Sequence, residues 1–212
     1  MALSGTFQRD VKLLVQQNMT EAALAANLAE AAIRLRAEAI SSGNAPDSWI
    51  RYVDGVRDRP ENAVRPDGTI LYHFNYLPEA TIFAIQQALQ KSPVKTGQYR
   101  RAWLVVVNGR IWSGDLGRIP PGSEVMVLNP EPYSRKLDTG AIRSSAKGII
   151  EAVRRTVNRR FPTLTAQRKF MNIPAGMIPG APWILKRSQS RSRDRQAGQP
   201  VTYPALVITE KQ

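Results

Sequence analysis

The triplet Asp138-Thr139-Gly140, between Leu137 and Ala141, is the part of this chain whose residue types could carry out a reaction. An aspartate of this kind can act with a second one, the two carboxyl groups sharing a single proton, because like charges in contact cannot both ionise. The purely structural alternative is a turn in which the Asp138 side chain accepts hydrogen bonds from backbone N–H groups and Gly140 takes a positive φ.

The triplet matches the local motif of retroviral-type aspartic proteases, but its context differs. Those enzymes place the triplet after an apolar strand, whereas Ser134-Arg135-Lys136 precedes it here. We therefore expect a turn and no catalysis, with an aspartic protease as the less favoured alternative. A change of Asp138 to Asn would abolish peptide cleavage if the chain were such a protease.

Other chemistry is restricted by composition. The chain has no cysteine and a single histidine, His73, which excludes disulfides and thiolate chemistry and leaves one imidazole for any metal site or triad. His73 lies between Tyr72 and Phe74 without partners nearby in the sequence, so we expect a structural or interface role. The glycines of residues 109–122 form neither a dinucleotide fingerprint nor a Walker loop. We expect no cofactor and no metal.

Positive charge is concentrated in the last third of the chain. The net charge is +13, and residues 141–212 hold 14 Lys and Arg against 3 Asp and Glu. An anionic partner follows from this bias: nucleic acid, a membrane surface or an acidic protein face. No specific base-reading motif accompanies the arginines, so a non-specific nucleic-acid-binding protein is the alternative function. The candidate residues for this contact are Arg154, Arg155, Arg159, Arg160, Arg187, Arg191, Arg193 and Arg195.

Periodicity and turn residues predict an α+β fold with a mainly antiparallel sheet packed by two or three helices. An Ala-rich helix is expected from Thr20, as N-cap, to about Ser41, and residues 7–18 could form an earlier turn or a continuation of it. The stripe Leu24, Leu28, Ala31, Leu35 has helical spacing, and so much alanine favours packing against another helix, including one from a second copy.

The remaining elements follow from proline, glycine and β-branched residues. Helices are expected over 78–90 and 145–160. Strands are expected over 49–53, 69–76, 99–108, 124–128, 164–173, 183–186 and 201–209. Asn108-Gly109 is a strong hairpin signal. The run 187–198 is expected to be a loop or a disordered arm. No stretch of eighteen apolar residues exists, so no membrane partner is expected.

Two segments resemble a known family. The run Ser92-Pro93-Val94-Lys95-Thr96-Gly97-Gln98-Tyr99-Arg100-Arg101-Ala102 is similar to the P-V-x-T-G-x-L-R-x-S element of the tail-completion and neck proteins of tailed phages, the group that includes the minor tail protein Z of phage lambda. Tyr99 stands where that family usually has Leu. A Tyr-Ala…Glu-x-Gly element follows in the family; here Tyr133 and Gly140 match it, Ser134 replaces Ala, and Asp138 replaces Glu.

The resemblance spans roughly residues 78–160 and implies a non-enzymatic virion protein. It implies a ring, commonly a hexamer, that joins the head to the tail, with portal- or adaptor-side and tail-side proteins as neighbours and DNA in the channel as a possible contact. Assembly in the host cytoplasm would precede incorporation into the virion. The implied interface residues are Thr96, Gly97, Tyr99, Arg100, Tyr133, Asp138 and Gly140.

We expect a single domain over 1–212. Within it we place an N-terminal helical extension over 1–43, an α+β core over 69–186, and a basic arm with a final strand over 187–212.

Overall fold

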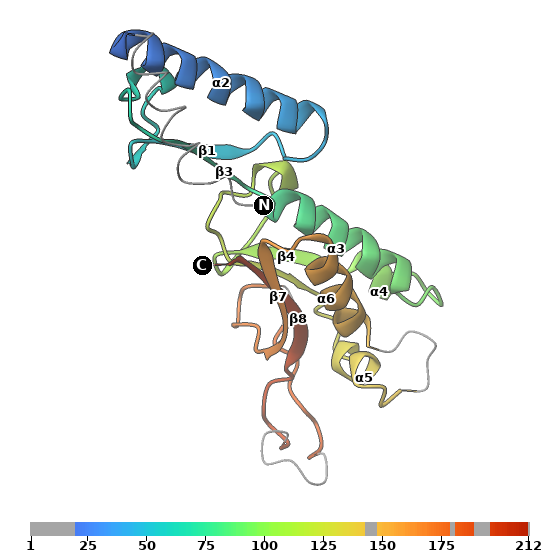
Figure 1. Cartoon of the computed structure of the whole chain (residues 1–212). Helices are drawn as coiled ribbons and strands as arrows, with labels where there is room; N and C mark the ends of the chain where they lie inside the picture. Colours follow the sequence, from blue (N-terminus) through green and yellow to red (C-terminus); the bar gives the residue numbers. More distant parts are fainter. Residues whose placement is uncertain (1–19, 143–147, 179–180, 189–195, 212) are drawn as a thin grey trace, which may run out of the picture. The chain divides into compact units, whose positions relative to one another are not determined.

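The computed structural model describes residues 20–142, 148–178, 181–188 and 196–211 (Figure 1). The chain divides between Asn75 and Tyr76 into two compact units, here called the first and the second unit. Both combine helices with antiparallel sheets, so the predicted α+β class is confirmed. The expectation of a single domain over 1–212 stays a prediction.

The first unit places one long helix on a small sheet. Its elements are α2 (Glu21–Ser41), β1 (Trp49–Val53), β2 (Val56–Arg57), the 3-10 turn η1 (Glu61–Ala63) and β3 (Ile70–Phe74). The predicted start of α2 is confirmed, because the Thr20 hydroxyl accepts a hydrogen bond from the Ala23 N–H at 3.3 Å. Strands β1 and β3 also lie where the sequence predicted them. The predicted turn over 7–18 lies outside the described residues.

The sheet of the first unit has the order β2-β1-β3, so β3 is an edge strand. Its buried apolar cluster consists of Ala29, Val53 and Val64. The stripe of α2 that includes Leu28 and Leu35 is not buried, and these two side chains are 39% and 59% exposed. The buried residue of α2 is instead Ala29, one position along from the predicted stripe, and Leu28 and Leu35 line an open hollow between α2 and β3.

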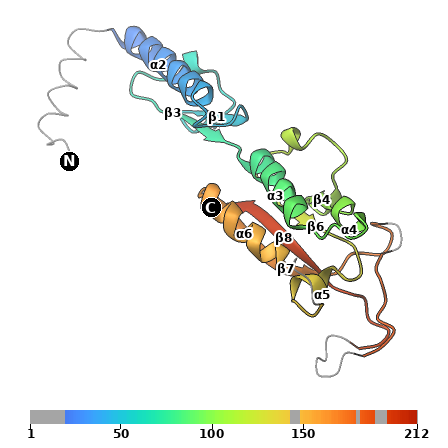
Figure 2. The same cartoon turned by 90° about the vertical axis from the view of Figure 1, so that its right-hand side faces the viewer.

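The second unit is a five-stranded sheet with helices on one face (Figure 2). Its helices are α3 (Leu77–Lys91), α4 (Gln98–Arg101), α5 (Ser134–Asp138) and α6 (Ile149–Arg160), with the 3-10 turn η2 (Leu116–Arg118). Its strands are β4 (Leu104–Val107), β5 (Arg110–Ile111), β6 (Val125–Leu128), β7 (Leu164–Met171) and β8 (Tyr203–Glu210). The order is β5-β4-β6-β8-β7, antiparallel throughout.

Both faces of this sheet are covered, which explains why β4 and β6 are apolar in every position. Val105 and Val127 face the cluster that α3 and α6 contribute to, whereas Val106 and Met126 face a second cluster. The segment after β7 supplies Ile173 to that second cluster. Each fully buried Val, Leu or Ile stabilises the fold by about 1.5–3 kcal/mol.

The predicted hairpin at Asn108-Gly109 is confirmed. The two residues have φ of 49° and 78° and connect β4 to β5. These left-handed angles fit a type I′ turn, whose twist matches that of paired strands.

One side chain closes part of the outer edge of β7. Asn158 on α6 donates from Nδ2 to the Ala166 carbonyl at 2.9 Å and accepts from the Ala166 N–H at 2.7 Å. Its amide therefore occupies both backbone groups that a further strand would use at this position.

The structure corrects four sequence expectations. The strand expected over 99–108 begins only at Leu104, because Gln98–Arg101 form α4. Helix α6 begins at Ile149 rather than at residue 145, since Gly148 has a left-handed φ of 64°. The strand expected over 183–186 is reduced to a single bridge between Ile184 and Pro200. Strand β3 pairs with β1 in the first unit, whereas the sequence placed it in the core that begins at residue 69.

Candidate functional site

The two motif segments, separated by some thirty residues, meet in the second unit. The ring centroids of Tyr99 and Tyr133 are 5.7 Å apart. Asn129 donates from its side chain to the Tyr99 carbonyl at 2.7 Å, and Gln98 donates to Glu131 at 3.0 Å. We call the packed residues Tyr99, Trp103, Asn129, Tyr133 and Ser134 the motif junction.

Tyr99 anchors the motif junction from the inside. Its side chain is 3% exposed and packs edge-on against Trp103 at 5.7 Å. Burial raises the pKa of the Tyr99 hydroxyl above its usual value, although a hydrogen bond with Ser134 opposes the shift. Trp103 in turn donates to the Ser92 hydroxyl at 2.8 Å, which ties the end of α3 to the same cluster. Tyr99 is thus a packing residue within this chain rather than an exposed contact.

Asp138 is held by partners within its own chain. Its carboxylate accepts from the Ile150 N–H at 3.0 Å, at the start of α6, and from Arg168 on β7 at 3.1 Å. Burial raises the pKa of Asp138, while the Ile150 hydrogen bond and the Arg168 charge act in the opposite direction. Asp138, which was predicted to lie in a turn, is the last residue of α5. Its carboxylate joins α5 to α6 and β7. Both oxygens of the carboxylate are engaged in these contacts, which gives Asp138 a structural role.

The other residues expected at an interface surround this junction at the surface. Thr96, Arg100 and Gly140 are exposed, whereas Gly97 and Tyr133 are half-buried. Gly97 has a φ of 73° and caps α4, so Thr96-Gly97 launches a short helix and not the central strand that the sequence predicted. A rigid packed base therefore lies beneath an exposed turn.

The arginines of α6 are largely occupied. Arg154 donates twice to Glu151, at 2.7 and 2.9 Å, and Arg155 donates to the same carboxylate at 3.1 Å. The Arg154 hydrogen bonds are the main reason why the pKa of Glu151 falls to about 2. Arg160 lies over the Phe83 ring at 4.8 Å, whereas Arg159 is exposed.

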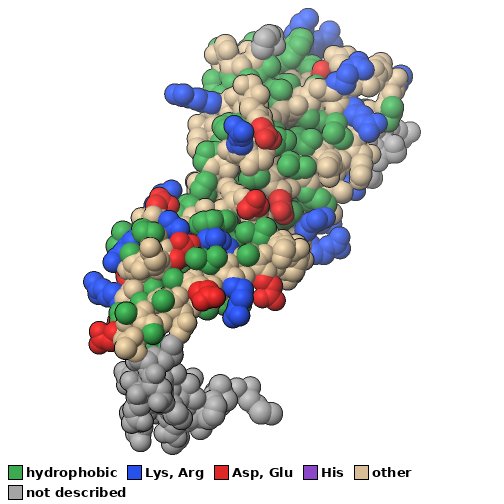
Figure 3. Space-filling view, turned by 90° about the horizontal axis from the view of Figure 1, so that it is seen from above, with side chains coloured by type: hydrophobic (Ala, Val, Ile, Leu, Met, Phe, Trp, Pro, Cys, Tyr) green, Lys and Arg blue, Asp and Glu red, His purple; other side chains and the backbone are tan. Residues whose placement is uncertain are grey.

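The basic arm lies mostly outside the described residues. Arg187 is described and exposed, whereas Arg191, Arg193 and Arg195 fall in the undescribed segment 189–195. The base of the arm is paired, because the Gly198 N–H donates to the Leu185 carbonyl at 2.9 Å. On the face drawn in Figure 3, Lys and Arg side chains are scattered among apolar and acidic ones and do not gather into one patch.

The first unit contains a charged cluster that sequence analysis missed. Glu61, 7% exposed, accepts from Arg36 at 2.8 Å, from the Tyr72 hydroxyl at 2.9 Å, and from Arg51. Burial would raise the pKa of Glu61, but its own backbone N–H, Tyr72 and the two arginines outweigh burial and lower it. Arg36 also lies over the Trp49 ring at 4.2 Å. A single arginine on the inward face of an Ala-rich helix was the signal available in the sequence.

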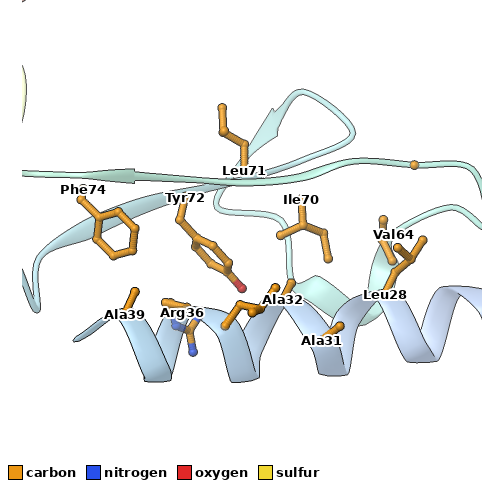
Figure 4. Close-up of a pocket in the computed structure, with 12 residues that line it drawn as sticks. Leu28, Ala31, Ala32, Arg36, Ala39, Val64, Ile70, Leu71, Tyr72 and Phe74 are labelled. Atoms are coloured by element: carbon orange, nitrogen blue, oxygen red, sulfur yellow. The ribbon is translucent and has the colours of Figure 1, made fainter. Parts of the chain in front are cut away.

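An open apolar hollow of about 380 Å³ lies between α2 and β3 (Figure 4). Its lining includes Leu28, Leu35, Ile70 and Leu71. The polar side chains that line it, Arg36 and Tyr72, are bound to Glu61. The hollow therefore has the character of a docking surface more than that of a catalytic pocket, in which polar groups converge on the open space.

Comparison with protein-family models, curated proteins and solved structures finds no significant match to this chain. Within the described ranges, His, Asp and Glu side chains form no group of three or more that could hold a metal ion. No helix among those residues is long and apolar enough to cross a bilayer. His73 lies on the exposed side of β3.

Proposed function

We propose that this chain is a structural virion protein of a tailed bacteriophage. It is a ring-forming neck, head-tail connector or tail-completion subunit, and it has no enzymatic role. Six copies per ring is the number that the resemblance favours, with portal- or adaptor-side and tail-side proteins as neighbours.

The observation that carries the proposal is that the first unit buries few apolar side chains and leaves several large ones exposed. Among its described residues three apolar side chains form the buried cluster, while Leu28, Ile33, Leu35 and Leu71 are each more than one-third exposed. Units this small gain stability from further burial, commonly by oligomerisation. A protein that completes its packing against neighbours fits a ring subunit better than it fits a free-standing enzyme.

The motif junction supports the same proposal. It packs the two segments that resemble phage neck proteins into one rigid base, from which Thr96 and Arg100 project. A closed ring joins two different faces of each subunit, so each face must keep a defined shape. A turn fixed by buried aromatic rings meets that requirement.

Mass measurement tests the proposal directly. Native mass spectrometry and light scattering of the purified full chain are expected to give a closed oligomer. A reconstruction of the phage neck is expected to place this chain in one ring. A protein that stays monomeric at high concentration and is absent from purified virions would overturn the proposal.

A further inference from the structure

Strand β3 differs from the other edge strands among the described residues. The two sheets end in β2, β3, β5 and β7. Strands β2 and β5 are two residues long and carry Arg57 and Arg110, and Asn158 covers part of the β7 edge. Short length, charge and coverage keep a strand edge from pairing with another chain. Strand β3 is five residues long and contains no Lys, Arg, Asp, Glu or Pro, so none of these features protects it.

The backbone of β3 presents hydrogen-bonding groups along its open edge. The Asp54 N–H donates to the Thr69 carbonyl at 2.8 Å, and the Asn75 N–H donates to the Ser48 carbonyl at 2.7 Å. Because hydrogen-bonded positions alternate along an antiparallel pair, residues 71 and 73 direct their backbone groups to β1. The N–H and C=O groups of residues 70, 72 and 74 therefore point away from β1, to the open edge.

The apolar stripe of α2 is open on the same side as this edge. Leu28 and Leu35 line the hollow between α2 and β3, toward which the side chains of alternate β3 residues point (Figure 4). The Arg36 charge in the hollow is paired with Glu61, and the Tyr72 hydroxyl donates to the same carboxylate. A partner that fits this surface therefore supplies an apolar strand for the edge and an apolar helix face for the stripe.

A second copy of the chain supplies both through the same residues. In an antiparallel pair of β3 strands centred on Tyr72, the outward backbone groups of the two Tyr72 residues meet, and Ile70 lies opposite Phe74 of the other copy. Aromatic and β-branched residues are favourable cross-strand partners. Since the other edge strands are short, charged or covered, β3 is the strand of a second copy that is best suited to pair with β3.

The spacing of the two helices supports this arrangement. Helix α2 covers β1 and β3, because Ala29, Val53 of β1 and Ile70 of β3 pack in one cluster. Across a two-fold axis between the β3 strands, the midpoints of these two strand pairs are two strand spacings apart, or about 9.5 Å. Helices pack at interaxial distances of about 8–10 Å. The stripes that contain Leu28 and Leu35 would therefore be in contact.

We propose that two copies of this chain associate about a two-fold axis, by antiparallel pairing of their β3 strands and contact between their α2 helices. The two sheets join in the order β2-β1-β3-β3-β1-β2, with both α2 helices on one face. The inference names the partner of the exposed apolar surface on which the proposed function rests. A closed hexamer would contain three such pairs, as in dihedral assemblies.

Disulfide formation tests the register, and the absence of native cysteine makes its readout clean. In the proposed pair Leu71 lies opposite His73 of the other copy, at a position where Cα atoms are about 4.5 Å apart. The two Leu71 residues lie about 8 Å apart, beyond the reach of a disulfide, and so do the two His73 residues. Leu71→Cys and His73→Cys chains produced together should form a disulfide-linked dimer under mild oxidation, and neither variant alone should. No mixed dimer, or a dimer of either variant alone, would overturn the proposal.

A charge on the helix stripe tests the α2 contact. Leu35→Lys places an ammonium group between the two helices and should weaken association by more than about tenfold in sedimentation equilibrium. Ala37→Lys is the matched control, because Ala37 is exposed on α2 and does not line the hollow. Both variants should keep the helix content of the unmodified chain in circular dichroism, since Leu35 is 59% exposed. Equal association of the two variants would count against the paired helices and overturn the proposal.

The number of copies separates this inference from the proposed function. A two-fold contact made by every copy gives an even number, which native mass spectrometry of the full chain measures. An odd-numbered ring would overturn the pairing and leave the virion proposal intact. A monomeric chain also overturns the pairing, and it overturns the proposed function as well if the chain is absent from virions. Paired chains that are absent from virions would support the pairing and contradict the proposed function alone.

Discussion

At the residue scale, the most consequential side chain is the Glu61 carboxylate. It joins Arg36 of α2 to Arg51 and Tyr72 of the sheet. A buried carboxylate without such partners would be strongly unfavourable, so the cluster holds α2 in one register on the sheet. Burial, together with the hydrogen bond to Glu61, raises the pKa of Tyr72 to about 12.

Removal of this charge is expected to loosen the first unit. Glu61→Gln keeps one acceptor but leaves two arginines without a counter-ion, which should lower the free energy of unfolding by about 2–3 kcal/mol. Urea unfolding followed by tryptophan fluorescence, to which Trp49, the ring beneath Arg36, contributes, measures the effect. Asp58→Asn is the control, because the Asp58 side chain is 73% exposed and should change stability by less than about 0.5 kcal/mol. Equal effects of the two changes would contradict a structural role for Glu61.

Acid is expected to release α2 through the same carboxylate. The pKa of Glu61 is lower in the folded protein than its ordinary value of 4.5, so its stabilisation is fully present above pH 4.5. That contribution is lost as pH falls through the folded pKa, when Glu61 binds a proton. A pH titration of the unfolding midpoint should show this loss in the unmodified protein and a weaker one in Glu61→Gln. A parallel decline in both would assign the acid sensitivity to other groups.

At the element scale, α4 forms because of the glycine before it, although the strand propensity of the residues that follow predicted a β-strand. Tyr99 to Asn108 has the aromatic and β-branched composition of a strand, but Gly97 takes a left-handed conformation and starts a helical turn. That turn buries Tyr99 against Tyr133, a contact between segments far apart in the sequence.

Gly97→Ala is expected to destabilise the second unit. A Cβ at this φ of 73° is strained and would lie 3.1 Å from Nη1 of Arg101, so a loss of about 1 kcal/mol is expected. Thermal unfolding followed by near-ultraviolet circular dichroism, to which Trp103 contributes, measures it. Gly114→Ala is the matched control: its φ is not left-handed, and its Cβ would make an ordinary 3.5 Å contact with Trp112. A lower melting temperature for Gly114→Ala than for Gly97→Ala would contradict the assignment.

Local rules predicted most elements of the fold and few of the contacts at the site. Thr20, Asn108-Gly109 and Ser92-Pro93 act on adjacent backbone, so caps, hairpins and helix ends could be placed from the sequence. The partners of Glu61 and Asp138 come from elements up to thirty residues away in the sequence. No periodicity encodes such pairs, so their burial was not predicted and Asp138 was expected at a surface.

At the scale of the whole molecule, the positively charged side chains differ in how far they are free to bind an anionic partner. The α6 arginines mostly have partners, whereas the predicted arm, with Arg187 at its start, is the remaining concentration of positive charge in the sequence. Contact with DNA would therefore depend on the arm more than on the helix.

Salt dependence separates these two sources of charge. Arg187, Arg191, Arg193 and Arg195 changed together to Gln should flatten the plot of log affinity for duplex DNA against log salt by about 0.9 for each phosphate that the arm no longer neutralises. Arg154→Gln is the control, since that guanidinium is paired with Glu151. Filter binding or fluorescence anisotropy at several salt concentrations measures the slope. No binding, or an unchanged slope, would remove DNA as a partner of the arm.

The amide of Asn158 on the edge of β7 also has a consequence for solubility. An open strand edge is a template on which identical chains can stack into fibrils. By occupying the N–H and C=O of Ala166, Asn158 interrupts that template without adding charge or a bulge. The second unit thus carries its own protection against edge-to-edge aggregation at this position of β7.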